Sequence, residues 1–260
     1  MNHYQVSWVF HSNFLPVKPT FLGQRVLKCY DLDELVARID WTPFFSTWEM
    51  KGKYPAILKE PVAADLHCDA LALLDQIVQE GSLQAEAVLG FFPATSQDDM
   101  VVLQPEGSPE IRLEFPRQRG ETGDERARLC LADFVAPKES GLSDHLGMFA
   151  VTAGKGCDAL AADFETDNDD YRALLAKSLA DRLAEAFAER LHQKVRTEFW
   201  GYAPEESLDG TNLIAEKYRG IRPAPGYPAC PEHALKDSIF DLLDVRKHTS
   251  LRMTENRAIS

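Results

Sequence analysis

The segment at residues 221–233, IRPAPGYPACPEH, has the backbone and the side chains of a small-ligand site. Four of its residues are prolines, and each proline fixes its own φ, removes a backbone donor and keeps the preceding residue out of the helical region. We therefore expect a stiff, extended loop with one pivot, at Gly226. The loop carries one guanidinium, Arg222, and one aromatic ring, Tyr227. A few fixed polar groups that lose little entropy on binding are what a preorganised site requires.

Arg222 and Asp40 each have a structural and a ligand-binding interpretation. Arg222 could be a cation at the end of a helix or a partner in a surface ion pair, but arginine is also favoured for bidentate recognition of a carboxylate. Asp40 stands before Thr42 and Pro43, where an aspartate often caps or starts a turn. Local chemistry leaves both interpretations open for both residues.

Asp181 and Glu185 are spaced one helical turn apart and therefore share a helix face. Because Asp and Glu are mostly exposed, the simplest interpretation is a pair of solvated carboxylates beside Lys177 and Arg182. A hydrolase that uses the two as acid and base is a weak alternative, because carboxylates one turn apart sit side by side rather than across a cleft.

Metal and phosphate sites find little support in the sequence. Cys230 and His233 have the spacing of half a metal site, but no second ligand pair with suitable spacing accompanies them. The run Gly154-Lys155-Gly156 is too short for a phosphate-binding loop. We expect no bound metal, and we find no candidate for a general base.

Composition narrows the class of protein. The 260 residues carry a formal charge of −13, the opposite of the balance expected in a nucleic-acid binder. No apolar run is long enough for a membrane span, and no signal peptide is evident at the N-terminus. The five cysteines are an odd number without a CxxC pair, which indicates reduced thiols. We expect a cytoplasmic protein that binds neither nucleic acid nor a membrane.

Hydrophobic patterning predicts two kinds of element. Short β-rich runs separated by Gly, Pro and Asp are expected to be strands at Arg25–Tyr30, Ala87–Ala94, Met100–Gln104, Glu110–Phe115, Arg128–Val135 and Gly147–Thr152. Helical spacing covers Asp31–Ile39, Pro61–Glu80, Asp169–Thr197 and a last helix between Pro231 and Lys247, with Pro231 near its first turn. Residues 41–45, WTPFF, are predicted to be a Pro-broken aromatic loop, and Gln118–Arg126 a polar loop.

Sequential strands with grouped helices predict an α+β fold, with a central twisted antiparallel sheet. The long predicted helix also carries Ala176, Ala180, Ala184 and Ala188 at i, i+4 spacing, a row that lets another backbone approach closely. Residues 1–20 are expected to form an N-terminal arm or linker, and residues 21–260 the domain itself.

Several ordered motifs resemble the activation, or reactivation, domain of cobalamin-dependent methionine synthase. They are GIRPAPGYPACPEH at 220–233, DWTPFF at 40–45 with TW and GKYP after it, LADFVAPK at 131–138 (a strand in this interpretation), KSLADRLAEAFAE at 177–189, FWGYA at 199–203 and LRMTE at 251–255. The matches run in order from about Pro19 to the last residues. The family normally continues past this last motif, so the resemblance implies a chain whose C-terminal part is missing.

The resemblance also implies roles for particular residues in binding S-adenosylmethionine. Arg222 would hold the methionyl carboxylate, and Asp40 would take the α-ammonium. These charges suit a zwitterion, which needs one cation and one anion. Glu185 and Ala224 would line the same cofactor site. Tyr227 would lie where the nucleoside meets the corrin ring.

A cobalamin-bearing module is the partner that the resemblance implies. Asp181, with Tyr227, would face this module. The run Asp144-His145-Leu146-Gly147 resembles a cobalamin-ligating motif only superficially, because its spacing is wrong, so we expect cobalamin to be held by the partner. No catalytic residue is expected, because the cobalt is itself a strong nucleophile and the domain has only to position the methyl group.

The implied function is to support reductive methylation of cob(II)alamin to methylcobalamin in methionine biosynthesis. The domain would be a methyltransferase component, inactive alone, and a flavodoxin-type protein would supply the electron. The alternative is a non-catalytic module that binds S-adenosylmethionine or docks to a corrinoid protein without turnover.

Overall fold

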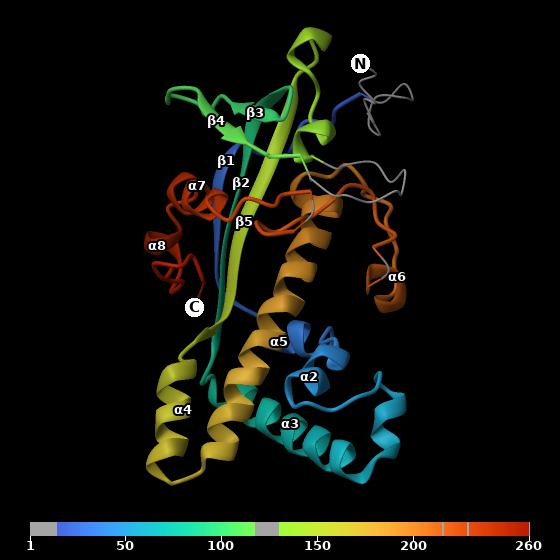
Figure 1. The fold of residues 1–260 in the computed structure, drawn as a ribbon, viewed down its shortest axis with the longest axis vertical. Coiled ribbons are helices and arrows are strands. Elements are labelled where there is room, and N and C mark those ends of the chain that lie inside the picture. Colours follow the sequence, from blue (N-terminus) through green and yellow to red (C-terminus); the bar gives the residue numbers. More distant parts are fainter. Residues whose placement is uncertain (1–14, 118–129, 215, 228, 260) are drawn as a thin grey trace.

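The computed structural model describes residues 15–117, 130–214, 216–227 and 229–259, and Figure 1 shows their arrangement. Its centre is an antiparallel sheet of strands β1 (Gly23–Tyr30), β2 (Gln84–Gln97), β3 (Met100–Leu103), β4 (Ile111–Glu114) and β5 (Asp144–Lys155). The long β2 pairs with β5 from Gln84 to Ala94. On its other edge β2 pairs first with β1 and then with β3, which pairs in turn with β4.

Strand β2 is buried on both of its faces. Successive side chains of a strand point to opposite sides. Ala85, Ala87, Leu89 and Phe91 join the larger core cluster, which the helices α1 to α5 complete. Val88, Phe92 and Ala94 join a second cluster with α7 and α8. Figure 1 shows the long helix α5 and the pair α7 and α8 on opposite sides of the sheet.

The helices are α1 (Leu32–Val36), α2 (Trp41–Thr47), α3 (Pro61–Glu80), α4 (Cys157–Thr166), α5 (Asp170–Lys194), α6 (Gly210–Ile214), α7 (Leu235–Leu242) and α8 (Val245–His248). Single 3₁₀ turns lie at Ala56–Lys59 (η1), Leu131–Phe134 (η2) and Lys138–Ser140 (η3). A π-helical turn, η4 (Val195–Phe199), follows α5 directly. In the part of the chain described here, no helix is both long and apolar enough to cross a membrane.

The α+β prediction is confirmed, and several boundaries are too. Helix α3 spans Pro61–Glu80 and ends at Gly81, whose φ of +64° suits a residue without a side chain. The strands Arg25–Tyr30, Ala87–Ala94, Met100–Gln104, Glu110–Phe115 and Gly147–Thr152 all fall within or beside observed strands. Ala180, one of the alanine row of α5, faces the sheet: a Cβ placed on Gly154 of β5 would lie 3.9 Å from that of Ala180.

Three sequence predictions are wrong. Residues 41–45 form the start of α2 rather than a loop, because Asp40 caps the helix and a proline is tolerated in a first turn. The predicted strand Arg128–Val135, with the LADFVAPK segment, is instead the 3₁₀ turn η2 in its described part. There the Asp133 carboxylate accepts a hydrogen bond from the Cys130 amide and another from Arg117. The last helix starts at Leu235, beyond Pro231, and breaks into α7 and α8.

The predicted loop at Gln118–Arg126 and residues 1–14 lie outside the described residues. The end of the predicted N-terminal arm contacts the segment after α5. The Val17 carbonyl accepts a 2.7 Å hydrogen bond from the Trp200 indole, and the Thr20 amide donates to Phe199 O at 3.1 Å.

Candidate functional site

Asp40 is held at the N-terminus of α2. Its Oδ1 accepts a 2.9 Å hydrogen bond from the Thr42 amide, which satisfies one of the free donors of the first helical turn. The side chains of Trp41, Phe44 and Phe45 anchor the helix in the core. The capping interpretation of Asp40 is therefore correct, and the half-buried carboxylate is fixed at a defined point.

The Pro-rich loop is rigid beyond what its prolines impose. The Gly226 amide donates to Cys230 O and the Cys230 amide to Tyr227 O, both at 2.8 Å. Gly226 has a φ of +110°, and a Cβ at this position would lie 2.5 Å from the His233 ring. Only glycine fits there, because another residue would be strained in its backbone and would collide with the imidazole. The pivot predicted at Gly226 is thus a tight turn with a fixed conformation.

Arg222, Asp40 and helix α5 come together around Glu189. Burial raises the pKa of Glu189, the positive charges of Arg222, Arg38 and Arg196 oppose that rise, and the negative charge of Asp40 adds to it. The three cations and Asp40 therefore lie within electrostatic range of one carboxylate on α5. The Nε donor of Arg222 is buried and has no acceptor among the described residues. A buried donor without a partner is costly, so this guanidinium suits an anionic ligand.

A hydrogen-bonded network is centred on Arg196, whose side chain is fully buried and whose charge acts on Glu189. Two guanidinium nitrogens of Arg196 donate to Glu206, at 2.7 and 2.6 Å, and a third lies 2.7 Å from His192 Nδ1. The guanidinium also stacks on the Tyr218 ring, 4.2 Å from its centroid. Burial, helped by the charges of Arg196 and Arg222, lowers the pKa of His192 to about 3. His192 is therefore neutral at physiological pH and accepts at Nδ1.

The other predicted site residues lie at the surface. Glu185 is exposed one helical turn before Glu189 on α5. Asp181 is exposed one turn earlier, and its charge contributes to the raised pKa of Cys157 at the start of α4, although burial is the larger cause. Lys177, which could have paired with Asp181, instead bonds Glu165 at 3.2 Å.

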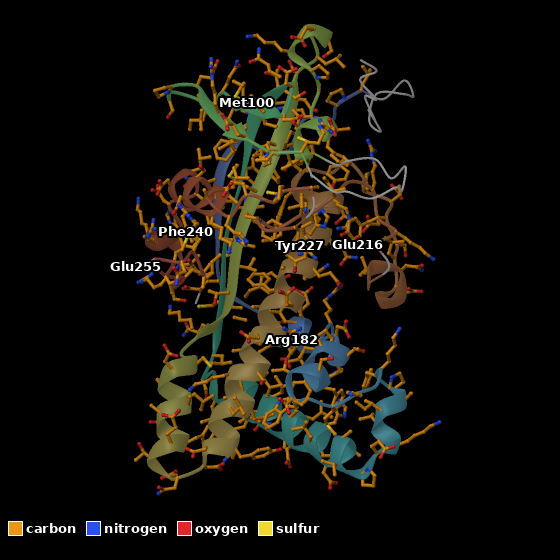
Figure 2. All side chains as sticks on the ribbon, in the orientation of Figure 1. Met100, Arg182, Glu216, Tyr227, Phe240 and Glu255 are labelled. Carbon is orange, nitrogen blue, oxygen red and sulfur yellow. The ribbon has the colours of Figure 1, made fainter. Side chains whose placement is uncertain are left out.

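Ala224 and Tyr227 are both exposed on the Pro-rich loop, with Tyr227 exposed by 63%. Along the long axis of the molecule, Tyr227 lies at the level of the C-terminal half of α5, above Arg182 (Figure 2). The structure thus joins Asp40 and Arg222 through Glu189, with Glu185 adjacent on the same helix. Asp181 lies earlier on α5, within electrostatic range of Cys157 at the start of α4.

Sequence reasoning missed Glu189, His192, Arg196 and Tyr218. A signal was present in the spacing, because Glu185 and Glu189 are one turn apart, as are His192 and Arg196. In the described residues, no group of three or more His, Cys, Asp and Glu side chains is placed to hold a metal ion. Burial raises the pKa of Cys230 to about 11, so its thiol is protonated at neutral pH.

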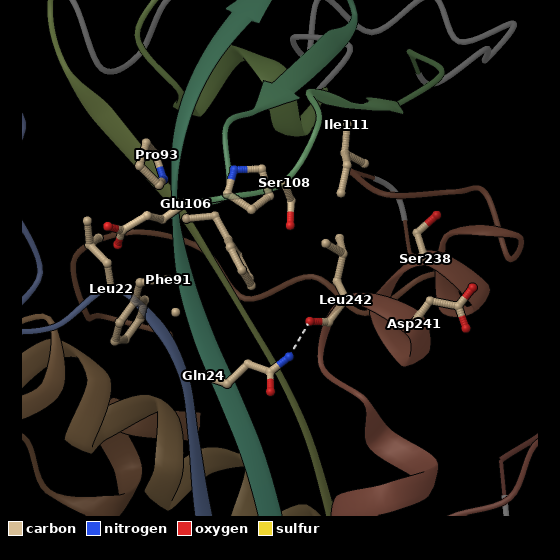
Figure 3. A pocket seen from close by; sticks show the side chains of 13 residues that line it. Leu22, Gln24, Phe91, Pro93, Glu106, Ser108, Ile111, Ser238, Asp241 and Leu242 are labelled. Carbon is tan, nitrogen blue, oxygen red and sulfur yellow. Dashed lines mark hydrogen bonds between the residues drawn. The ribbon is translucent and has the colours of Figure 1, made fainter.

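A pocket of about 800 Å³ lies elsewhere, between the start of β1, the connection from β3 to β4, and helix α7 (Figure 3). Phe91, Ile111 and Leu242 contribute apolar surface, and Gln24 spans it with a 2.6 Å hydrogen bond to Leu242 O. None of the predicted site residues lines this pocket.

Two comparisons with known proteins match most or all of this chain. The family model for the vitamin B12 dependent methionine synthase activation domain matches residues 31–260. A solved structure described as the MetH reactivation domain bound to AdoHcy is similar with a TM-score of 0.88 and 44% sequence identity. The match covers 100% of this chain and 79% of that one. The chain therefore belongs to the family of methionine synthase activation domains, part of a cobalamin-dependent methyltransferase.

Proposed function

We propose that this chain binds S-adenosylmethionine and presents it to a cobalamin held by another module of methionine synthase. The observation that carries the proposal is the buried Nε donor of Arg222, which has no acceptor among the described residues. Arg222 lies within electrostatic range of the Glu189 carboxylate, and so does Asp40. A free amino acid group has a carboxylate for such a cation and an ammonium for such an anion. The AdoHcy bound to the similar reactivation domain carries the same amino acid group.

Each predicted residue has a part in this proposal. Arg222 binds the carboxylate, as a planar fork suited to two parallel hydrogen bonds. Asp40, fixed by its capping bond, binds the α-ammonium, with Glu185 on the exposed side of α5. The backbone at Ala224 lines the nucleoside side of the site, and the exposed ring of Tyr227 covers it.

Methyl transfer then takes place at an interface, because the domain holds the donor and the partner holds the acceptor. S-adenosylmethionine supplies an electrophilic methyl group, and cobalamin supplies the nucleophile. The residues of this chain orient the donor and exclude water, and Asp181 and Tyr227 are exposed where the cobalamin module would dock. A flavodoxin-type protein is the proposed electron donor.

The test has two stages. Calorimetric titration of the chain with S-adenosylmethionine and with AdoHcy should show binding of both. The chain is then mixed with a cobalamin-bearing methionine synthase that lacks its own activation domain, together with reduced flavodoxin. We expect loss of the cob(II)alamin absorption band, and no reaction with homocysteine by the chain alone. Binding without any spectral change would favour a non-catalytic binding module, and absence of binding would refute the proposal.

A further inference from the structure

We propose that His233 is a positioning residue for the nucleoside side of the site: its imidazole ring packs against Gly226 and closes the one pivot of the Pro-rich loop. His233 is the last residue of the same segment. This inference rests on the proposed function, because Ala224 and Tyr227, on either side of Gly226, are the residues assigned there to the nucleoside.

Gly226 is the position at which the loop has most freedom to change shape. Pro223 and Pro225 fix their own φ, whereas a glycine populates positive and negative φ about equally well. The observed φ of Gly226 is +110°. A different conformation here would move the exposed ring of Tyr227 relative to Ala224. A ligand that contacts both residues would then have to restore the turn, and would lose affinity in doing so.

The contact between Gly226 and His233 is direct. The three heavy atoms nearest to an ideal Cβ on Gly226 all belong to the His233 ring: Cε1 at 2.5 Å, Nε2 at 3.0 Å and Nδ1 at 3.2 Å. The ring therefore fills the space beside the α-carbon that a side chain would take in any other residue. A contact this close leaves the α-carbon no room to move towards the ring, so it favours the observed turn over the others that a glycine permits.

The turn is also held from within, by three backbone hydrogen bonds. The amides of Gly226, Tyr227 and Cys230 donate to Cys230 O, Ala224 O and Tyr227 O, at 2.8, 3.0 and 2.8 Å. These bonds lie in an exposed part of the loop, where water competes for the same donors and acceptors. The His233 ring adds a steric restraint that water cannot replace.

His233 can act as a wedge because its backbone is anchored, although the residue itself is exposed. Its carbonyl accepts a 3.1 Å hydrogen bond from the Lys236 amide. Two residues after His233, Leu235 begins α7 and is buried with Cys230 in the second core cluster. The ring thus projects from a fixed point of the scaffold onto the pivot of the loop.

The substitution His233→Ala tests the wedge with two ligands, S-adenosylmethionine and 5′-methylthioadenosine, which lacks the amino acid group. We expect both to bind about tenfold more weakly, because the freed pivot adds roughly the conformational entropy of one residue. Arg222→Ala, by contrast, should weaken S-adenosylmethionine alone. His248→Ala is the matched control: it removes a half-buried imidazole from α8, outside the loop, and should leave both affinities within about twofold of the unmodified protein.

His233→Phe separates the bulk of the ring from its nitrogen atoms. A flat ring on the same anchored backbone should recover most of the affinity for both ligands. No recovery would show that the nitrogens matter rather than the bulk, and would overturn the inference. The inference also fails if His233→Ala leaves the affinity for 5′-methylthioadenosine unchanged. If the unmodified protein binds neither ligand, the proposed function fails, and the wedge is then decided by hydrogen exchange.

Hydrogen exchange measured by NMR follows the turn without any ligand. The amides of Gly226, Tyr227 and Cys230, which donate within the turn, should exchange about tenfold faster in His233→Ala but not in His233→Phe. The Thr42 amide, which donates to Asp40, should exchange at the same rate in all variants, as a check that the rest of the fold is intact. Unchanged exchange at the three turn amides would refute the positioning role, whatever the titrations show.

Discussion

The N-terminal and C-terminal halves of helix α5 differ in the side chains that they bury and therefore in what they contribute to the molecule. The N-terminal half buries only small or apolar side chains such as Ala173, Leu175 and Leu179 against the sheet and the smaller helices. The C-terminal half also buries Phe187 and Leu191, but together with the π-helical turn it carries in addition the polar residues Glu185, Glu189, His192 and Arg196. Apolar burial is non-directional and tolerates approximate fits, whereas a buried charge is stable only with its partners in place. The N-terminal half, called here the scaffold half, therefore mainly stabilises the fold. The C-terminal half, called here the site half, gives up some stability to hold charges in fixed directions.

The largest effect on folding is expected at the site half, from Arg196→Met. This substitution leaves Glu206 buried without its cation and should lower the free energy of unfolding by about 3–5 kcal/mol, measured by urea denaturation. Arg246→Met is the control, because the exposed pair of Arg246 with Asp241 should contribute about 0–1 kcal/mol. Equal losses in the two variants would contradict the distinction between buried and surface charge.

A comparably large effect, on binding rather than folding, is expected for Arg222→Ala. Loss of a desolvated charge pair should weaken the binding of S-adenosylmethionine by about 2–5 kcal/mol in a calorimetric titration. Arg222→Lys should recover only part of the affinity, because the planar fork is lost. Unchanged affinity in both variants would remove Arg222 from the site.

The pH dependence of stability should report on the buried imidazole. The pKa of His192 is lowered to about 3 from an ordinary value of 6.5, so between these values the unfolded chain binds a proton that the folded chain does not. The contribution of His192 to the free energy of unfolding is therefore fully present above pH 6.5. It falls by about 1.4 kcal/mol for each pH unit below that value. Between pH 6.5 and 5 the loss should be about 2 kcal/mol.

His192→Asn tests this assignment, because an amide oxygen can accept from Arg196 but does not titrate. Urea denaturation at pH 7 and pH 5 should give a smaller difference for the variant than for the unmodified protein. Parallel pH profiles for the two would show that another group causes the loss.

The last prediction concerns the N-terminal half of α5, where an effect on stability but none on binding is expected. Ala180→Leu should cost about 1–3 kcal/mol of stability through overpacking, because Ala180 is buried and faces Gly154 on β5. The affinity for S-adenosylmethionine should not change in a titration of the folded variant. A variant that folds as stably as the original but loses affinity would mean that the two halves of α5 are not separable in this way.

Helices and strands with a strong local sequence pattern were predicted well. Helix α3 shows this most plainly, since an apolar period and a terminal glycine determine its length. Elements with a weak local sequence pattern were missed or given the wrong type. Helix α4 was missed, and η2 was predicted as part of a strand, because Phe134 and the adjacent Val135 suit one. Its actual turn is stabilised by Arg117, at 2.6 Å from Asp133, a contact between residues that are distant in the sequence. Preference for a strand is small compared with such a tertiary interaction.

For the site, the sequence by itself determined which residue types were available: a rigid Pro-rich loop with Arg222 and Tyr227, a capping Asp40, and a helix face with Asp181 and Glu185. Periodicity and turn chemistry act over a few residues, so they can specify such pieces. Only the tertiary structure decided that Arg222 and Asp40 both act electrostatically on Glu189. It also decided that the Tyr218 ring packs against both His192 and Arg196. The physical reason is that charges and rings interact through space, and their separation depends on how β5, α5 and the loop pack together.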